Sequence, residues 1–187
     1  MPNASSACSN DLPELPVQYA DFAHWQRRSL HGGLLEKELA YWRGQLDGMP
    51  TIHSLPLDKP RPPAQRFAAQ RHGQFLDRAM LDALRQLGRD HGATLFMVLQ
   101  AAFATVISRF SGESDIVMGV PNAGRNRKEI APLIGFFINT LVFRSRIDDA
   151  LSVRELLEQS RRTALDAFGH ANVPFDLLSD TLAKLRN

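Results

Sequence analysis

The sequence contains little cysteine, no long apolar run and almost no excess of either charge. Its single cysteine, Cys8, cannot form an internal disulfide, which favours a reducing compartment, so we expect a cytoplasmic protein. The most apolar stretch, residues 95–107, is interrupted by Gln100 and is too short to span a bilayer. A net charge of +2 is too small to indicate a nucleic-acid surface. We therefore expect neither a membrane nor a nucleic-acid partner.

The N-terminal segment has no basic stretch followed by an apolar one, so no secretory signal is expected. Residues 1–14 are rich in Ser, Asn and Pro without periodicity, which predicts a flexible lead-in. The chain has 187 residues, of which 44% are hydrophobic and 22% charged. This length and composition are typical of one globular domain with a real core.

Residues 17–48 are predicted to form two linker helices. In the first, Phe22 and Trp25 share one side. The second carries an amphipathic stripe of Leu35, Leu39, Trp42 and Leu46 and is stopped by Gly48 and Pro50. Residues 49–66 contain five prolines, so they are predicted to be an extended connector rather than a helix or a central strand.

Residues 67–187 alternate between helical and strand patterns. The predicted strands are 68–76, a fully buried strand at 114–120 ended by Pro121, and 138–147. The predicted helices are one capped by Asp77, a buried one at 95–110 capped by Thr94, one running from a Ser152/Glu155 capping box to Gly169, and 175–182.

Alternating helices and mostly buried strands predict an α/β sandwich with helices packed on a small mixed sheet. Only about three strands are visible, below the roughly four to six of a typical sheet. We therefore expect part of a larger sheet.

The strand at 138–147 carries one unusual residue, Asn139, at its entrance among core-type side chains. A buried amide must be hydrogen-bonded, so Asn139 either braces the strand entrance through backbone groups or contributes to a functional cavity. Arg144 lies on the opposite face and is expected to form a salt bridge that fixes the strand.

Other polar and aromatic residues have a structural interpretation as well. Asp21 is expected to cap or ion-pair within its helix, Trp25 and Trp42 to lie in the core, and His170 to order the turn before Pro174. The loop at 124–128 is either a solvated loop or a contact for a phosphate, because glycine and basic residues suit an anion.

Several ordered motifs resemble those of the condensation domains of non-ribosomal peptide synthetases, over about residues 15–184. The last of them departs from the family's His-Gln-Asp-x-Pro-Phe-Glu pattern at Ala171, Asn172 and Asp176. The segments that carry the resemblance are Tyr19–Trp25, Leu39–Trp42, Leu55–Pro62, Gly92–Met97, Ser108–Gly112, Asp115–Gly119, Gly124–Arg127, Ile134–Arg144 and His170–Asp176.

The resemblance implies a partial chloramphenicol-acetyltransferase-like sandwich, mostly the second of two lobes, over residues 15–187. Such domains join a carrier-bound acyl or peptidyl thioester to a carrier-bound amine in a tunnel between the lobes. The implied partners are peptidyl and aminoacyl carrier proteins, with substrates tethered by phosphopantetheine and no cofactor bound directly. The resemblance implies a tunnel role for Gly135, Asn139 and Thr140, a carrier or phosphate contact for Arg125 and Arg127, and structural roles for Asp21, Trp25, Arg144, Pro174 and Phe175.

The family's catalytic motif, His-His-x-x-x-Asp-Gly, is absent. The six histidines are His24, His31, His53, His72, His91 and His170, and no two are adjacent. No catalytic residue and no metal ligand is therefore assigned. We expect a fragment that does not form amide bonds alone.

A second hypothesis is a non-catalytic module that docks a carrier protein or pairs with a separate first lobe. A truncated sheet leaves an unpaired edge and exposed apolar surface, which favours a partner or self-association.

Overall fold

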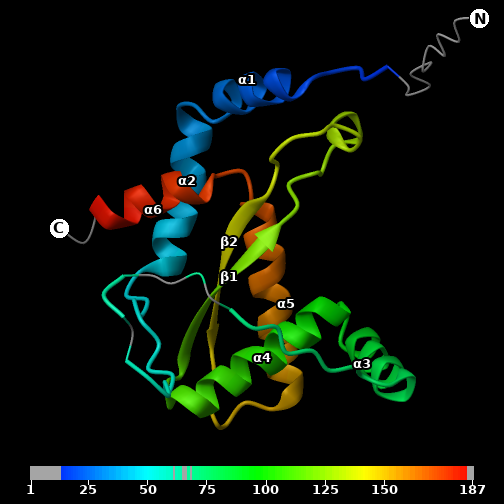
Figure 1. Cartoon of the computed structure of the whole chain (residues 1–187), viewed down its shortest axis with the longest axis vertical. Helices are drawn as coiled ribbons and strands as arrows, with labels where there is room; N and C mark the ends of the chain where they lie inside the picture. Colours follow the sequence, from blue (N-terminus) through cyan, green and yellow to red (C-terminus); the bar gives the residue numbers. More distant parts are fainter. Residues whose placement is uncertain (1–13, 61, 65–66, 68, 185–187) are drawn as a thin grey trace, which may run out of the picture.

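The computed structural model describes residues 14–60, 62–64, 67 and 69–184. The predicted lead-in, apart from residue 14, and Cys8 lie outside these residues. In chain order the elements are α1 (Tyr19–Ser29), α2 (Gly33–Leu46), α3 (Arg78–Asp90), α4 (Leu95–Ser111), β1 (Asp115–Asn122), η1 (Lys128–Ile130), β2 (Asn139–Arg146), α5 (Val153–Gly169) and α6 (Phe175–Lys184) (Figure 1).

β1 and β2 form a two-stranded antiparallel sheet, in which Asp115 lies opposite Arg146 and Asn122 opposite Asn139. The predicted α/β class with a small sheet is confirmed, but the sheet is antiparallel rather than mixed. The strand predicted at 68–76 is wrong: residues 69–76 belong to no helix or strand, and Phe75 is fully exposed. An extended segment becomes a strand only where a neighbour can pair with it, and no strand among the described residues pairs with 69–76.

β1 is less buried than its sequence predicts. Among its residues only Ile116 is fully buried, and the strand continues through Pro121 to Asn122 rather than ending at the proline. The backbone groups of Val117 point away from β2, toward His53. Alternation along the strand then directs the nitrogen of Pro121 outward too, where a missing N–H breaks no ladder bond.

The main core surrounds β2, which is buried on both faces from Leu141 to Ser145. The stripe predicted on α2 is confirmed, because Leu39, Trp42 and Leu46 are buried against the strand. Three further helices, α4, α5 and α6, and the turn before α6 complete this core through Met97, Ala164, Ala167, Val173 and Leu178. Burying large apolar side chains of this kind contributes about 1.5–3 kcal/mol each, which fixes α2 on the sheet.

A buried polar triad joins α4, β2 and α5. The amide of Gln100 donates to the Ser145 hydroxyl (3.0 Å), and the Ser160 hydroxyl lies 2.6 Å from Gln100 Oε1 and 2.8 Å from the carbonyl oxygen of Met97. Each buried polar group thus has a partner, as burial requires.

The predicted helix caps are confirmed. Asp77 accepts from the Met80 N–H (2.7 Å), Thr94 accepts from Met97 (3.3 Å), and Ser152 forms a capping box with Glu155. The Ser152 hydroxyl and N–H both donate to the Glu155 carboxylate, and they lower the pKa of that group.

The prediction that α4 is a buried helix is wrong for one of its two sides. On its buried side, Val98 and Ala101 pack against α3 and α5, and Ala104 packs against Ile116 of β1. The other side exposes a stripe of large apolar residues. We call this the α4 stripe: Phe96, Leu99, Phe103, Val106 and Phe110. Their spacing alternates between three and four residues, so they lie along one line of the helix.

In the part of the chain that the structure describes, no single helix has the length and hydropathy to cross a membrane. The helices α3 and α4 meet that test only as a pair, and they are bent by 100° relative to each other.

Candidate functional site

Asn139, the first residue of β2, ties the strand entrance to the turn between α5 and α6. Its Nδ2 donates to the carbonyl oxygens of Ala171 (3.0 Å) and Val173 (2.8 Å). Its Oδ1 accepts from the backbone N–H groups of Thr140 (2.9 Å) and Phe175 (3.0 Å). Both amide protons and both lone-pair sites are used, so the bracing interpretation of Asn139 is what the structure shows.

Asn139 also lies between two adjoining cavities, which share Phe22, Gln26 and Phe137 in their walls. The first, of about 430 Å³, lies between α1 and the loop after β1 and includes Trp25, Asn126, Arg127 and Asn172. The second, of about 400 Å³, includes Tyr19, Phe136, Thr140, Pro174, Phe175 and Asp176. The structure thus brings together Asn139 and Thr140 of the predicted tunnel set. Their contact with substrate stays a prediction.

Gly135, the third residue of that set, is covered by Tyr19 of α1. A Cβ at this position would overlap the Tyr19 ring, whose hydroxyl donates to the carbonyl oxygen of Phe136 (3.0 Å). Gly135 therefore lets α1 approach the chain before β2. Whether it also borders a substrate is untested.

Gly124 allows a second close approach beside the cavities. It adopts a φ of +67°, and an added Cβ would overlap the carbonyl oxygen of Phe137. Any side chain here would be strained by conformation and blocked by backbone. The loop after β1 is consequently pressed against the segment that leads into β2.

The two arginines of this loop are engaged with aromatic rings. The Arg125 guanidinium lies 4.3 Å from the centre of the Phe137 ring and donates to the carbonyl oxygens of Ile130 (2.7 Å) and Ala131 (3.1 Å). Arg127 lies 4.2 Å from the centre of the Trp25 ring, and its guanidinium makes no hydrogen bond to another described residue. The donors of Arg125 therefore hold the loop. The contact of Arg127 with a carrier or a phosphate stays a prediction.

Trp25 is not a core residue, so that prediction is wrong. It is 41% exposed and forms a wall of the first cavity beneath Arg127. Trp42, by contrast, is buried as predicted, and its indole N–H donates to the carbonyl oxygen of His170 (3.0 Å). Asp21 is confirmed as a helix cap, because its carboxylate accepts from the Gln18 N–H (2.8 Å).

His170 orders the turn, as the sequence predicts, by attaching it to α2. Its Nδ1 lies 2.8 Å from the buried carboxylate of Glu38, and its ring stacks on Tyr41 at 3.7 Å between centres. Burial and the nearby Asp166 raise the pKa of Tyr41 to about 12, which keeps the phenol neutral. Nothing in the sequence pattern identifies Glu38 as the partner, because it precedes His170 by 132 residues.

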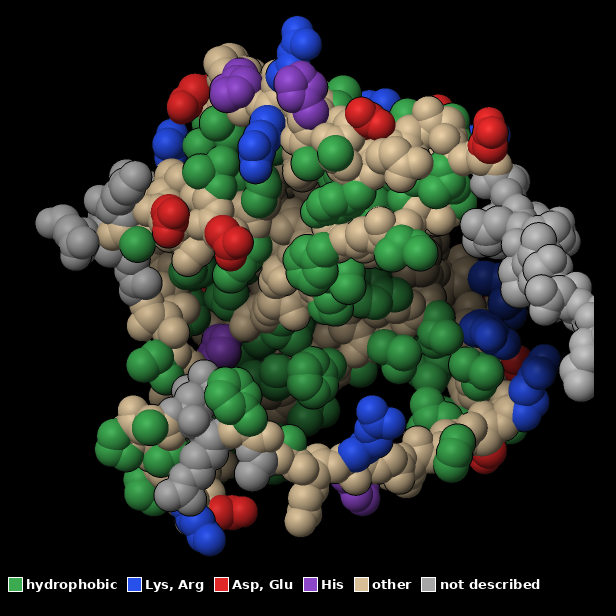
Figure 2. All heavy atoms as spheres, turned by 45° about the horizontal axis from the view of Figure 1, so that its top comes forward, with side chains coloured by type: hydrophobic (Ala, Val, Ile, Leu, Met, Phe, Trp, Pro, Cys, Tyr) green, Lys and Arg blue, Asp and Glu red, His purple; other side chains and the backbone are tan. Residues whose placement is uncertain are grey.

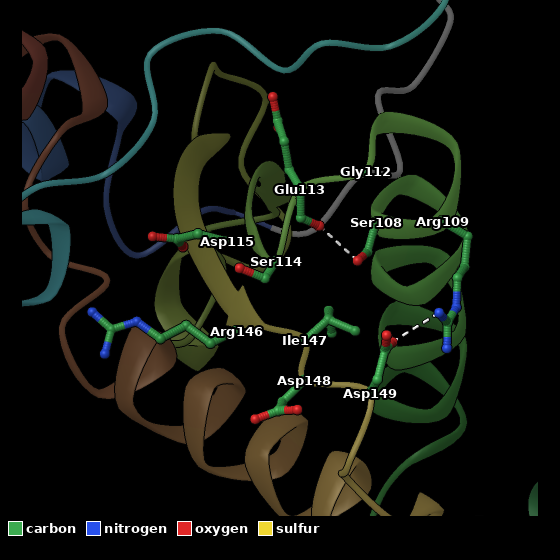
Figure 3. A pocket seen from close by; sticks show the side chains of 10 residues that line it. All are labelled: Ser108, Arg109, Gly112, Glu113, Ser114, Asp115, Arg146, Ile147, Asp148 and Asp149. Atoms are coloured by element: carbon green, nitrogen blue, oxygen red, sulfur yellow. Dashed lines mark hydrogen bonds and ion pairs between the residues drawn. The ribbon is translucent and has the colours of Figure 1, made fainter.

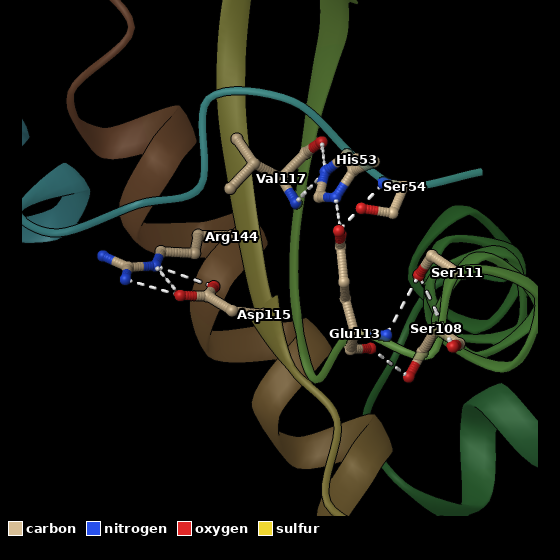
Figure 4. A network of polar contacts seen from close by, with 8 residues as sticks. All are labelled: His53, Ser54, Ser108, Ser111, Glu113, Asp115, Val117 and Arg144. Atoms are coloured by element: carbon tan, nitrogen blue, oxygen red, sulfur yellow. Dashed lines mark hydrogen bonds and ion pairs between the residues drawn. The ribbon is translucent and has the colours of Figure 1, made fainter.

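Arg144 borders neither of the two cavities and instead holds β2 in place. Its guanidinium holds both oxygens of Asp115 (2.6–3.1 Å) (Figure 4). It also donates to the carbonyl oxygens of Gln45 (3.0 Å) and Asp47 (2.7 Å). The hydrogen bonds to Asp115 raise the pKa of Arg144 against the effect of burial. The predicted salt bridge is confirmed, and it also closes the C-terminal end of α2.

A third cavity, of about 690 Å³, lies at the other end of the strands (Figure 3). Its ten lining residues include four carboxylates and two arginines, and it contains the ion pair of Arg109 with Asp149 (2.7 Å). None of the predicted site residues borders it. Within the described residues, no group of three His, Cys, Asp or Glu side chains is arranged to hold a metal ion.

The site around Asn139 can enclose and orient a ligand, but no histidine is among the described residues that border its two cavities. Nor do those residues include a nucleophile paired with a base within hydrogen-bond reach, which acid–base catalysis requires.

The sequence model of the condensation domain matches residues 4–187, so the chain belongs to the condensation-domain family. The match includes residues 4–14, which precede the segments that carry the resemblance. Condensation domains of this kind work with carrier domains in multidomain synthetases, whose substrates are tethered through phosphopantetheine.

Among curated relatives, one of the linear gramicidin synthase subunits from Brevibacillus parabrevis is 49% identical over 171 residues, which is 91% of this chain and 2% of that protein. Phosphinothricin tripeptide synthetase PhsC from Streptomyces viridochromogenes is 43% identical over 95% of this chain and 16% of that protein. The chain thus spans a small part of the curated relatives that it matches.

Solved structures agree with the fold. The X-domain from teicoplanin biosynthesis superimposes with a TM-score of 0.84 at 25% identity, over 92% of this chain and 40% of that one. SgcC5 from Streptomyces globisporus gives 0.74 at 30% identity, over 89% and 38%. In both, more than half of the compared chain has no counterpart here.

Proposed function

We propose that this chain supplies one wall of the substrate tunnel of a condensation domain, which joins a carrier-bound acyl or peptidyl thioester to a carrier-bound amine. The observation that carries the proposal is the convergence on Asn139 of three segments that share motifs with the family: α1, residues 134–144 and residues 170–176. Their described residues enclose two adjoining cavities without a proton-transfer pair. In this proposal the chain binds and orients substrate, and the base comes from another part of the domain.

The reaction forms a C–N bond and breaks the C–S bond of the thioester. The attacking amine loses a proton, and the departing sulfur of the phosphopantetheine arm ends as a thiol. Holding the thioester carbonyl and the amine in contact supplies much of the rate in such a step. Asn139 fixes the wall on which that alignment depends, because it holds the 171–175 turn against β2.

A condensation assay with two loaded carrier proteins tests the proposal. The isolated chain should give no amide product, whereas the chain mixed with a separately expressed first lobe that contains His-His-x-x-x-Asp-Gly should restore product. Turnover by the isolated chain would show that its own residues are sufficient, and the proposal would fail. Absence of product in the mixture, despite a stable complex, would also argue against it.

A second candidate function is a non-catalytic module that docks a carrier protein, and Arg127 is the feature that favours it. Its guanidinium lies over Trp25 at the rim of the first cavity, where it can meet a phosphate or an acidic surface. Arg127→Glu should weaken binding of a phosphopantetheinylated carrier by calorimetry, whereas Arg109→Glu, an exposed change far from this cavity, should not. Equal affinities in both variants would contradict carrier docking at Arg127.

A further inference from the structure

His53 connects the segment after α2 to β1 through an unusual set of bonds (Figure 4). Its Nδ1 lies 2.6 Å from Glu113 Oε2, and its Nε2 lies 3.0 Å from both the N atom and the O atom of Val117. The backbone N–H of Ser54 donates to the other carboxylate oxygen of Glu113 (2.8 Å). His53 is thus attached to β1 and to the turn before it, and Ser54 to that turn.

These bonds occupy the edge of β1 that faces away from β2. In an antiparallel pair, the outward backbone groups belong to alternate residues, here Asp115, Val117, Gly119 and Pro121. Unpaired groups on such an edge attract other strands, and proteins commonly cover them. The imidazole of His53 takes the place of a neighbouring peptide group at Val117.

We propose that His53 is a protonation-dependent latch that holds the start of the proline-rich connector over the outer edge of β1. The ionised Glu113 carboxylate has no proton, so Nδ1 must carry the hydrogen of that bond in either state of the ring. Neutral His53 then has a bare Nε2, which accepts the Val117 N–H. Protonated His53 instead donates Nε2–H to the Val117 carbonyl oxygen.

Two charged groups near the His53 ring determine the pH range in which the connector is held most firmly. They are Glu113, in the turn before β1, and Asp115, on β1 itself, which is in turn held by Arg144 of β2. The hydrogen bond to Glu113 raises the pKa of His53, against partial burial, and the same bond lowers the pKa of Glu113.

The two pKa shifts determine whether the attachment of the connector strengthens or weakens as pH rises. The contribution of His53 is complete below its unfolded pKa and is lost as pH rises through its folded pKa. The contribution of Glu113 is present above its unfolded pKa and is lost as pH falls through its folded pKa. The connector should therefore be held most firmly at mildly acidic pH and should loosen as the solution becomes alkaline. This inference does not depend on the proposed condensation activity.

Nuclear magnetic resonance of the isotope-labelled full chain tests the latch directly. The ring nitrogens of His53 should show the Nδ1–H tautomer at alkaline pH, and the Val117 amide proton should move with the ring titration. The Nε2–H tautomer at alkaline pH would overturn the proposal. Because the wild-type chain alone gives this result, the test holds even if a variant fails to fold.

A pair of matched variants tests the coupling. Glu113→Gln should lower the titration midpoint of His53, whereas Asp149→Asn, which changes an exposed carboxylate of a neighbouring ion pair, should leave it in place. The heteronuclear NOE of the Ser54 amide should fall above the His53 midpoint in the wild type and should be low at every pH in His53→Ala. An equal midpoint in Glu113→Gln and the wild type, or a Ser54 amide that stays rigid in His53→Ala, would refute a latch.

Discussion

At the scale of single residues, the molecule depends on side chains that satisfy several backbone groups at once. Asn139 joins the start of β2 to the 171–175 turn with four bonds, and Arg144 holds β1 and the end of α2 with five. A net hydrogen bond contributes about 0.5–1.5 kcal/mol, but a buried group left without its partner costs about 1–3 kcal/mol. Replacing Asn139 or Arg144 should therefore lower the free energy of unfolding by more than the loss of one hydrogen bond would.

Asn139→Ala should lower the free energy of unfolding by about 2–3 kcal/mol, because it leaves the carbonyl oxygens of Ala171 and Val173 without their hydrogen-bond donor. Asn139→Asp should cost more, since a carboxylate would face those same two oxygens. Urea unfolding measures both. Asn172→Ala is the control: its side chain borders the same cavity without a hydrogen bond to another described residue, so the change should stay within about 0.5 kcal/mol. In a complete condensation domain, we also expect lower turnover from Asn139→Ala. Equal stability of Asn139→Ala and Asn172→Ala would contradict the bracing role.

Arg144→Lys should destabilise the chain by about 2–4 kcal/mol, because lysine cannot replace a bidentate guanidinium beside a partly buried Asp115. Arg109→Lys provides the matched comparison, since its pair with Asp149 is exposed and should be worth at most about 0.5 kcal/mol. The urea midpoint should shift for Arg144→Lys at an unchanged slope. Similar shifts for the two variants would show that the Arg144 network is ordinary surface charge.

At the scale of helices and strands, local sequence signals predicted most boundaries correctly. The N-caps at Asp77, Thr94 and Ser152 were predictable because each cap bonds to an N–H only three residues away. The missing third strand and the exposed side of α4 were not, because both depend on whether another element lies alongside. The same limit applies to the site: motif positions indicated Asn139, whereas its partners Ala171 and Val173 come from a turn more than 30 residues away.

Ser152→Ala should destabilise α5 by about 1 kcal/mol near neutral pH through loss of its N-cap. The Ser152 bonds lower the pKa of Glu155, so their contribution exists above the unfolded pKa of that group and disappears as pH falls through the folded one. Thermal unfolding from acid to neutral pH should show a smaller difference between the wild type and the variant in acid, where only the bond from the Glu155 N–H to the Ser152 hydroxyl persists. Ser179→Ala, an exposed change inside α6, should show no such pH dependence. A constant difference between wild type and Ser152→Ala across the range would exclude the capping box as its cause.

At the scale of the whole molecule, apolar side chains gather over a broad part of one face (Figure 2). The α4 stripe is one exposed set, and Ile134, Phe136 and Ile138 form another beside the candidate site. Exposed apolar groups on this scale are typical of an interaction surface. The chains of the solved relatives continue well beyond the part matched here.

The size of the α4 stripe predicts weak rather than tight self-association. Five half-exposed apolar side chains offer on the order of 400–500 Å² to a partner, below the roughly 800 Å² per side of a stable interface. Light scattering after size exclusion should show an average mass that rises with concentration. Phe103→Lys should reduce that rise, whereas Ala102→Lys, exposed on the same helix beside the stripe, should not. A concentration-independent monomer in the wild type would exclude association through α4.

The unequal burial of the two tryptophans gives the molecule two optical reporters. Trp42 is sealed between α2 and the sheet, so its emission should be blue-shifted and inaccessible to acrylamide until the linker helix leaves the core. Trp25 lies at the cavity rim under a guanidinium, so its emission should be red-shifted and readily quenched. A ligand that enters the first cavity would shield only Trp25, and unfolding would release Trp42. A single tryptophan-fluorescence experiment can therefore distinguish occupation of the site from loss of the fold, without any added label.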